Sequence, residues 1–338
     1  MTDSRLVVNQ LAVAFSTDEG RVQAVADVSF KVGAGKTTAL VGESGSGKSV
    51  TSLALMRLLA SSAKTQVSGQ ALYAQANGEQ VDLLHLPLTQ MRDLRGNEIA
   101  MIFQEPMTCL NPVLTIGEQI AESLRRHKKV DRRSADAMTK RMLERVEIPA
   151  AAQRMREFPH QLSGGMRQRV MIALAMACEP RLLIADEPTT ALDVTIQAQI
   201  LELMRRLQAD SGMSILFITH NLSVVAQHAD EVAVMYAGRI VETAGVDGLF
   251  ETPGHPYTQA LLACLPSRQT SQMTAGGQRR LKAIRGQMAS ALVPAPGCSF
   301  EPRCDHAQET CRTAVPAMVS LPGGNAVRCV RAGQGQAV

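Results

Sequence analysis

The strongest constraint on the fold of this chain is the octapeptide Gly42-Glu43-Ser44-Gly45-Ser46-Gly47-Lys48-Ser49. It matches the pattern G-x-x-x-x-G-K-[ST] at every fixed position. The apolar run 38–41 predicts a buried strand before it, and the run 49–56 predicts a helix after it. Glycines let backbone N–H groups turn toward phosphate oxygens, and the helix adds the positive end of its dipole. The stretch is therefore predicted to be a phosphate-binding loop.

In such a loop Lys48 contacts the β- and γ-phosphates and the Ser49 hydroxyl contacts Mg²⁺. The other nucleotide contacts predicted here are Gly42, Ser44, Gly45, Ser46, Gly47 and Val50. A second G-K-T sequence, Gly35-Lys36-Thr37, has the wrong spacing, because a phosphate loop ending there would need glycine where the chain has Phe30. We interpret 33–35 as a turn between two strands.

Composition limits the classes of protein that fit. A length of 338 residues allows one large domain plus an accessory region. The formal net charge of +4, the aromatic content of 3% and the absence of tryptophan give no argument for a nucleic-acid partner. No apolar run approaches the ~18 residues that span a bilayer, and the first residues lack a secretory signal pattern. We therefore expect a cytoplasmic protein.

Two predicted strands end in groups suited to Mg²⁺ and water. The apolar run 182–185 leads into the adjacent carboxylates Asp186 and Glu187, where one could hold the metal and the other polarise a water molecule. The run 99–103 leads into Gln104, whose amide oxygen could coordinate a metal. Adjacent acids are more often surface charges and a lone Gln is usually solvated, but the buried strand before the two acids favours a functional role.

The run 214–219 predicts a further strand, which ends at His220. A lone histidine is usually structural, but in open parallel sheets ligands lie at the carboxyl ends of strands, so we favour a γ-phosphate contact. Phe15 stands at the end of a predicted strand, part of a hairpin formed by 6–15 and 22–32, where it could stack on a purine ring or belong to the core.

Ser163, Gly164 and Gly165 open a predicted helix over 166–177. They form either a second anion site of the helix N-terminus type or an ordinary N-cap. The pattern over 115–156 is helical and indicates a helical subdomain inserted in the α/β core. Asp193 leads into another predicted helix over 194–209.

Together and in this order, these residues resemble the ATPase subunit of ABC transporters over roughly the first three quarters of the chain. The resemblance makes Gln104 the glutamine loop, Leu162-Ser163-Gly164-Gly165-Met166 the signature, and Asp186 the metal aspartate. It makes Glu187 the catalytic glutamate and His220 the histidine switch. Asp193 matches the loop that contacts the second subunit, and Phe15 the adenine-stacking position. An active ATPase that binds ATP and Mg²⁺ is implied.

The implied fold is α/β: an ABC-type P-loop ATPase with a RecA-like parallel-sheet core, an antiparallel β subdomain and an inserted helical subdomain at about 105–178. The expected nucleotide-binding domain is 1–253, and 254–338 is expected to be a C-terminal extension. In the family two ATPase subunits pack head to tail, so that Ser163, Gly164 and Gly165 of one close over the ATP of the other.

Within the family the chain is similar to the D-type ATPase of bacterial dipeptide/oligopeptide importers, on the stretches 103–112, 158–165 and 254–261. This implies uptake of peptides or a related small solute such as nickel. The implied partners are an F-type ATPase subunit, two transmembrane permease subunits and an extracytoplasmic solute-binding protein. A homodimer remains open. The implied location is peripheral, on the cytoplasmic face of the inner membrane.

Two other functions are weighed against this one. A soluble ABC ATPase acting on nucleic acid or ribosomes is disfavoured, because the 115 positions from Lys48 to Ser163 carry no sustained heptads and only one set of motifs is present. A nonhydrolytic scaffold is disfavoured by the intact Glu187 and His220.

The cysteines Cys298, Cys304, Cys311 and Cys329 crowd the C-terminal end. Four thiolates match a structural zinc or a [4Fe–4S] cluster, although the close C-x₂₋₄-C pairs of zinc ribbons are missing. Unligated cysteines in a loop-rich tail with little core are the third possibility. Because the tail resembles the cysteine-containing extension of D-type ATPases, some of which bind an iron–sulfur cluster, we expect [4Fe–4S] with no part in ATP chemistry.

Overall fold

The computed structural model describes residues 4–60, 64–104, 109–190, 192–265, 271–273, 279–281, 284–288 and 296–333. The chain divides into two compact units. The helical unit comprises Met1–Leu6, Val32–Lys36 and Tyr73–Phe217. The phosphate-loop unit comprises Val7–Lys31, Thr37–Leu72 and Ile218–Val338. Residues 105–108, where the helical subdomain is predicted to begin, lie outside the described residues.

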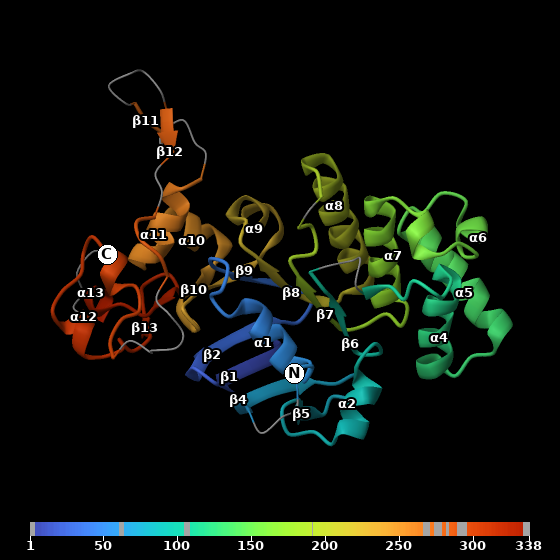
Figure 1. Ribbon diagram of the computed structural model, residues 1–338, viewed down its shortest axis with the longest axis horizontal. Coiled ribbons are helices and arrows are strands. Elements are labelled where there is room, and N and C mark those ends of the chain that lie inside the picture. The colour runs from blue at the N-terminus through green and yellow to red at the C-terminus, as the bar shows by residue number, and fades with distance from the viewer. Residues whose placement is uncertain are drawn as a thin grey trace. The chain divides into compact units, whose positions relative to one another are not determined.

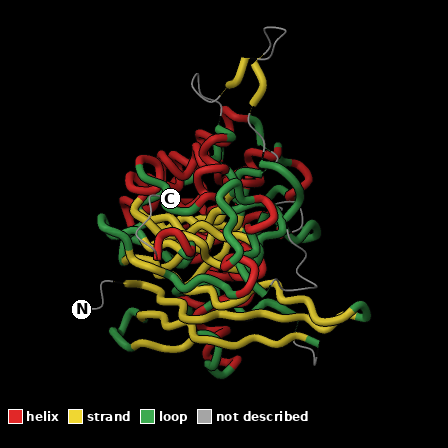
Figure 2. Tube along the Cα trace, turned by 90° about the vertical axis from the view of Figure 1, so that its left-hand side faces the viewer, coloured by secondary structure: helices red, strands yellow, loops and turns green. Residues whose placement is uncertain are grey.

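Three long strands near the N-terminus are neighbours in one sheet, in the order β2-β1-β4. They are β1 (Ser4–Thr17), β2 (Gly20–Gly33) and β4 (Thr65–Ala74). Figure 2 shows long strands of this kind in yellow. Apolar and polar residues alternate along β1, and its side chains Leu6, Val8, Leu11 and Val13 are buried, as expected for a strand with one face on a core. The predicted hairpin around 18–20 is confirmed.

The second sheet of the phosphate-loop unit begins with a parallel pair, β3 (Thr37–Val41) and β9 (Glu231–Tyr236). β9 also pairs antiparallel with β10 (Arg239–Gly245). β10 is not the edge of this sheet. β14 (Ala326–Val327) pairs with β10, and β13 (Val319–Ser320) pairs with β14. The extension thus satisfies backbone groups at the edge of β10.

Short helices cover this unit: α1 (Lys48–Leu55), α9 (Leu222–His228), α10 (Val246–Glu251) and α11 (Pro256–Ala263). The extension adds β11 (Ser271–Met273), β12 (Arg279–Leu281), the 3₁₀ turn η2 (Glu301–Arg303), α12 (Thr310–Thr313) and α13 (Val330–Gly333).

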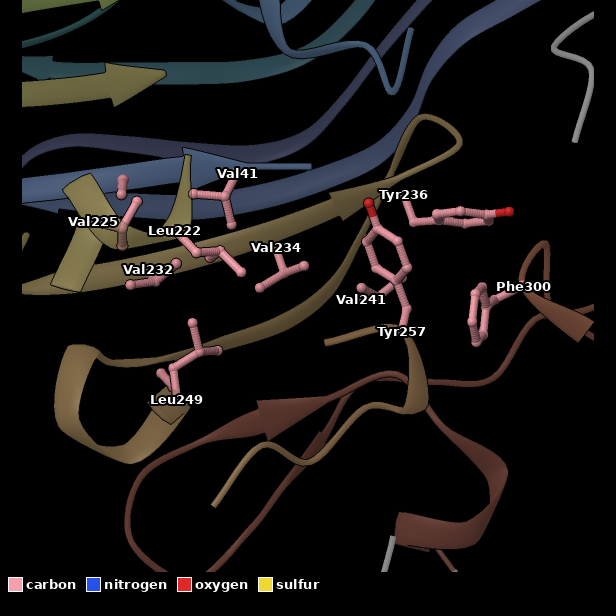
Figure 3. Packing of buried hydrophobic residues seen from close by; sticks show 12 residues of the cluster. Val41, Leu222, Val225, Val232, Val234, Tyr236, Val241, Leu249, Tyr257 and Phe300 are labelled. Atoms are coloured by element: carbon pink, nitrogen blue, oxygen red, sulfur yellow. The ribbon is translucent and has the colours of Figure 1, made fainter. Parts of the chain in front are cut away.

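The extension contributes buried side chains to a hydrophobic core. Tyr257 and Phe300 are buried in one hydrophobic cluster with Tyr236, Val241 and other residues of the sheet (Figure 3). The sequence did not predict this core, because the extension is rich in proline and glycine and its buried residues are few and far apart along the chain.

The helical unit holds the parallel pair β6 (Ile99–Ile102) and β7 (Leu182–Asp186), with β8 (Ser214–Thr219) as the next neighbour of β7. Its other elements are β5 (Gln80–Asp82), α2 (Leu88–Leu94), α4 (Ile116–Lys128), α5 (Arg132–Arg145), α6 (Ala151–Arg154), η1 (Pro159–Gln161), α7 (Gly164–Met176) and α8 (Val194–Ser211).

Helices α4, α5 and α7 pack against one another (Figure 1, green). One face of α4, formed by Ile116, Ile120 and Leu124, is apolar and buried. The helical subdomain thus has its own apolar core. Among the described residues, no helix is both long enough and apolar enough to cross a membrane.

Candidate nucleotide-binding site

The phosphate loop runs from the end of β3 into α1, as predicted. The Lys48 ammonium is buried and donates to the carbonyl oxygens of Gly42 at 2.8 Å and Glu43 at 2.9 Å, with the Ser46 hydroxyl 3.5 Å away. The loop therefore curls around the lysine. The Lys48 ammonium is thus enclosed by the backbone of the loop, as in phosphate-binding loops.

Two glycines of the loop are required by its shape. Gly47 has a φ of 103°, and a Cβ there would lie 2.5 Å from the Ala24 carbonyl oxygen. A Cβ on Gly42 would collide with the Met235 carbonyl oxygen. Both positions exclude a side chain, one by conformation and space and the other by space alone.

Other residues of the phosphate-loop unit that are predicted to contact the nucleotide are at least partly exposed. Ser44 and Gly45 are exposed in the loop, while Ser49 and Val50 are half-buried in the first turn of α1. Phe15 is half-buried near the end of β1, and His220 is exposed directly after β8. A half-buried ring at a strand end is compatible with stacking on a base.

The carboxylates of the helical unit lie at the end of β7. Asp186 is its last residue and is buried, and Glu187 follows. The Glu187 carboxylate accepts hydrogen bonds from Gln104 Nε2 at 3.3 Å and from the Thr190 hydroxyl at 2.9 Å. Because β6 and β7 are parallel, their carboxyl ends share one edge, and this brings Gln104 to Glu187.

Glu187 also has an unusual backbone. Its φ of 45° lies in the left-handed region, which costs a non-glycine residue of order 1–3 kcal/mol. The Thr190 N–H donates to the Glu187 carbonyl at 3.1 Å and closes the turn. Strained residues of this kind concentrate at functional sites, where the surrounding structure holds one side chain in a fixed direction.

The signature residues form the start of α7. The Ser163 side chain caps the helix by accepting from the Met166 N–H at 3.4 Å. Ser163 and Gly164 are exposed, and a Cβ on Gly164 would meet no atom within 4 Å. The free space above this N-terminus leaves its N–H groups able to receive an anion.

Asp193 caps α8 by accepting from the Ile196 N–H at 2.9 Å. α7 and α8 approach closely here, since a Cβ on Gly165 would lie 3.2 Å from Ile196. The sequence did not single out Gln168, which is buried and donates from Nε2 to the Pro188 carbonyl. It joins the signature helix to the turn after Glu187. Because Gln168 lies between Arg167 and Arg169, the sequence gives no local signal for its burial.

The predicted residues thus form two groups. Phe15, the phosphate loop and His220 belong to the phosphate-loop unit. Gln104, Asp186, Glu187, Asp193 and the signature belong to the helical unit, where Gln104 and Glu187 are in contact.

The four C-terminal cysteines form no disulfide and line one small pocket, together with His255 and His306. Burial, with a smaller contribution from the other three thiols, raises the pKa of the Cys298 thiol to about 11. Nevertheless, no group of three or more His, Cys, Asp and Glu side chains in the described ranges has the arrangement of metal ligands. The four thiols line the same pocket, but the described side chains are not arranged as the ligands of a metal ion.

Comparison with protein families gives three matches, one of which is a model described as "AAA domain, putative AbiEii toxin, Type IV TA system" over residues 157–226. A model described as "ABC transporter" matches residues 25–190. A model described as "Oligopeptide/dipeptide transporter, C-terminal region" matches 241–311, which includes Cys298, Cys304 and Cys311.

Among relatives, a putative peptide import ATP-binding protein of Brucella ovis is 50% identical over 327 residues, 96% of each chain. The oligopeptide transport ATP-binding protein AppD of Bacillus subtilis is 49% identical over 324 residues, 96% of this chain and 95% of that one.

Two solved structures share the fold. The ATP-binding cassette MJ0796, in a dimeric post-hydrolysis state with ADP and Pi, has a TM-score of 0.62 at 23% identity and covers 71% of this chain and 98% of that one. The cbiO1 protein of Clostridium perfringens, part of the transporter complex cbiONQ, has a TM-score of 0.60 at 25% identity and covers 74% of this chain and 92% of that one.

Proposed function

The chain belongs to the ATP-binding subunits of ABC transporters, in the oligopeptide/dipeptide group, and on this premise we propose that it hydrolyses ATP to drive the import of peptides. The observation that carries the proposal is the phosphate loop, in which the buried Lys48 is surrounded by backbone carbonyls. Phosphate oxygens would replace these carbonyls as partners of the ammonium.

The phosphate-loop unit would bind the nucleotide. Lys48 and the N–H groups of residues 44–50 would hold the β- and γ-phosphates, and Phe15 would stack on the adenine. His220 would contact the γ-phosphate. Mg²⁺ would be held by the Ser49 hydroxyl, Gln104 and Asp186, and it would neutralise charge on the phosphates. These oxygen donors fit a hard cation.

Glu187 would orient and polarise the attacking water molecule. Its carboxylate is already fixed by Gln104 and Thr190, so catalysis would rest on positioning and charge stabilisation, with no covalent enzyme intermediate. The signature residues 163–165 and Asp193 would act on the nucleotide of a second ATPase subunit. The exposed N-terminus of α7 supports this role, because it is accessible to an anion brought by a partner.

Lys48→Ala tests the ATPase assignment, with Lys36→Ala as the matched control. Both lysines lie in a G-K-[ST] sequence, but only Lys48 lies in the phosphate loop. Loss of a charged phosphate contact is expected to lower ATP turnover by at least about 10²-fold, whereas Lys36→Ala should keep wild-type turnover. Equal activity of both variants would contradict the assignment.

We propose that the ATPase works at the cytoplasmic face of the inner membrane with two transmembrane permease subunits and an extracytoplasmic solute-binding protein. Copurification from native membranes should identify these partners. Reconstituted in vesicles with the solute-binding protein, the complex should accumulate labelled di- or oligopeptides only with ATP. ATP-dependent uptake of nickel and not of peptides would overturn the peptide assignment while leaving the ATPase intact.

We further propose that the second ATPase subunit is a related F-type chain. The support is the similarity to the D-type group, whose members generally work beside such a chain. Solute-stimulated ATP hydrolysis should then require both polypeptides. Full activity of a complex that contains only this ATPase would show a homodimer instead.

Finally, we propose that Cys298, Cys304, Cys311 and Cys329 bind a [4Fe–4S] cluster. The shared pocket and the soft thiol donors support this, since four cysteines are the ligand set of such clusters. Burial raises the pKa of the Cys298 and Cys304 thiols, and a metal centre would stabilise their thiolates. The cluster would order the extension and take no part in ATP chemistry.

A further inference from the structure

Glu43 connects the phosphate loop to the C-terminal extension. Its carbonyl oxygen, as described above, accepts from the Lys48 ammonium, and it also accepts from the Ser46 N–H at 3.2 Å. Its other two polar groups are held by the extension. The Glu43 N–H donates to the Tyr257 hydroxyl at 2.9 Å, and its carboxylate pairs with Arg303.

The Arg303–Glu43 pair is bidentate, with Nη1 to Oε2 at 2.8 Å and Nη2 to Oε1 at 3.1 Å. The Arg303 side chain is 6% exposed and that of Glu43 27%. Parallel charge-assisted hydrogen bonds fix both distance and orientation, and partial burial protects them from water and salt. Such a pair can therefore hold a loop in one geometry, which a fully exposed pair does poorly.

Arg303 is itself held in place from three sides. Its Nε donates to the Arg285 carbonyl at 2.7 Å, its Nη1 to the Tyr236 hydroxyl at 3.3 Å, and the guanidinium lies 5.8 Å from the Tyr236 ring centroid. The short turn η2 that carries Arg303 is fixed by Phe300, the buried residue just before it.

The Tyr257 hydroxyl is equally well fixed. The rings of Tyr257, Tyr236 and Phe300 pack together, with centroids 4.6 to 5.4 Å apart (Figure 3). Tyr257 thus belongs to the aromatic cluster and Arg303 is held against its Tyr236. Side chains locked by packing can position a neighbouring site.

We propose that Arg303 and Tyr257 are positioning residues for the phosphate loop: by holding Glu43, they fix the backbone that faces Lys48 and so set the affinity for the nucleotide phosphates. The inference rests on the proposed function in taking Mg-ATP as the ligand. It assigns the extension an indirect role in nucleotide binding, exerted through Glu43, in addition to any metal that its cysteines hold.

A mutant cycle on the full chain tests the pair: Arg303→Gln, Glu43→Gln and the double variant, with the Kd for a fluorescent Mg-ATP analogue as the readout. Each single variant should weaken binding roughly tenfold, within the usual range of coupling between sites. The double variant should bind no worse than either single one, because all three lack the same interaction. Arg303→Lys, which keeps the charge without the planar fork, should restore part of the affinity.

Arg312→Gln is the matched control. Arg312 belongs to the same extension and pairs with Glu301 at 2.8 Å. Its side chain is 70% exposed, and its partner Glu301 lies outside the phosphate loop. This variant should keep the wild-type Kd. A general loss of stability lowers the folded fraction without changing the Kd of the folded protein, so Kd separates positioning from folding.

Tyr257→Phe is the second, independent variant, and it keeps the result decisive if Arg303→Gln does not fold. It removes only the hydroxyl that accepts from the Glu43 N–H and keeps the packed ring. It should weaken Mg-ATP binding severalfold. A wild-type Kd for folded Arg303→Gln or, failing that, for Tyr257→Phe would overturn the inference, and so would strict additivity in the mutant cycle. Failure of the wild-type chain itself to bind the analogue would instead refute the proposed function.

Discussion

At the scale of single residues, Glu187 combines a strained backbone with a carboxylate held by two donors. Glu187→Gln should keep ATP binding and lose turnover by about 10²- to 10⁴-fold, because an amide keeps the shape but cannot act as a general base. Single-turnover hydrolysis and nucleotide binding measured on the same preparation would separate the two effects.

Glu202→Gln is the control for this variant, since Glu202 is an exposed residue of α8 that pairs with Arg205. It should hydrolyse ATP at the wild-type rate. Near-normal steady-state turnover of Glu187→Gln, with the sites of any partner ATPase also disabled, would rule out Glu187 as the base.

Gly42→Ala addresses the space in the phosphate loop. The new Cβ would collide with the Met235 carbonyl oxygen and approach the Ser46 hydroxyl, so the loop must shift and nucleotide affinity should fall at least about tenfold. Gly245→Ala is the matched control, because a Cβ there meets no atom within 4 Å. Equal Mg-ATP affinity of the two variants would show that the loop tolerates the shift.

At the scale of elements, the N-terminus of α11 depends on a neutral histidine. The His255 Nδ1 accepts from the Tyr257 N–H at 3.0 Å, and burial lowers the His255 pKa to about 3. Between pH 6.5 and pH 3, His255 therefore binds a proton in the unfolded chain but not in the folded chain. Stability is fully present above pH 6.5 and should fall toward pH 3, by up to about 1.4 kcal/mol per pH unit.

Denaturant unfolding followed by circular dichroism at pH 7.5, 6.5 and 5.5 checks this, with His255→Asn as the comparison. Asparagine can cap the helix and does not titrate. Burial raises the pKa of the neighbouring Glu242, which acts in the opposite sense but is present in both proteins. The loss of stability from pH 7.5 to 5.5 should be larger for the wild type. Equal losses would show that His255 is not responsible.

The sequence predicted the elements of the nucleotide site well, because each has a local cause. The strand before the phosphate loop is a fully buried β3, and α1 begins at Lys48. The apolar run before Asp186 is likewise the fully buried β7. Such elements show as continuous apolar runs, and glycine or a capping residue marks where they end.

At the scale of the whole chain, local sequence patterns did not predict which distant residues are in contact. Glu43 and Arg303 are 260 positions apart, and neither is unusual among its sequence neighbours. The pairing of β14 with β10 involves only two residue pairs, too few for a strand pattern to be visible. Tertiary packing of the extension decides both features.

The cysteine pocket gives the last prediction. Anaerobically purified protein should be brown, with broad absorption near ~400 nm from sulfur-to-iron charge transfer. Cys304→Ser or Cys311→Ser should lose the colour, because each removes one of the thiols that line the pocket. Cys264→Ser is the matched control, since Cys264 is a half-buried cysteine that does not line this pocket, and it should stay brown.

Metal analysis of the same anaerobic protein distinguishes the alternatives. Iron and acid-labile sulfide at about four per chain support the cluster. A colourless protein with one zinc per chain would replace the cluster by a Cys₄ zinc site, for which the pocket offers the same donors. A preparation with neither metal would mean that the four cysteines bind no metal, in line with the raised pKa of Cys298, and that the aromatic cluster orders the extension.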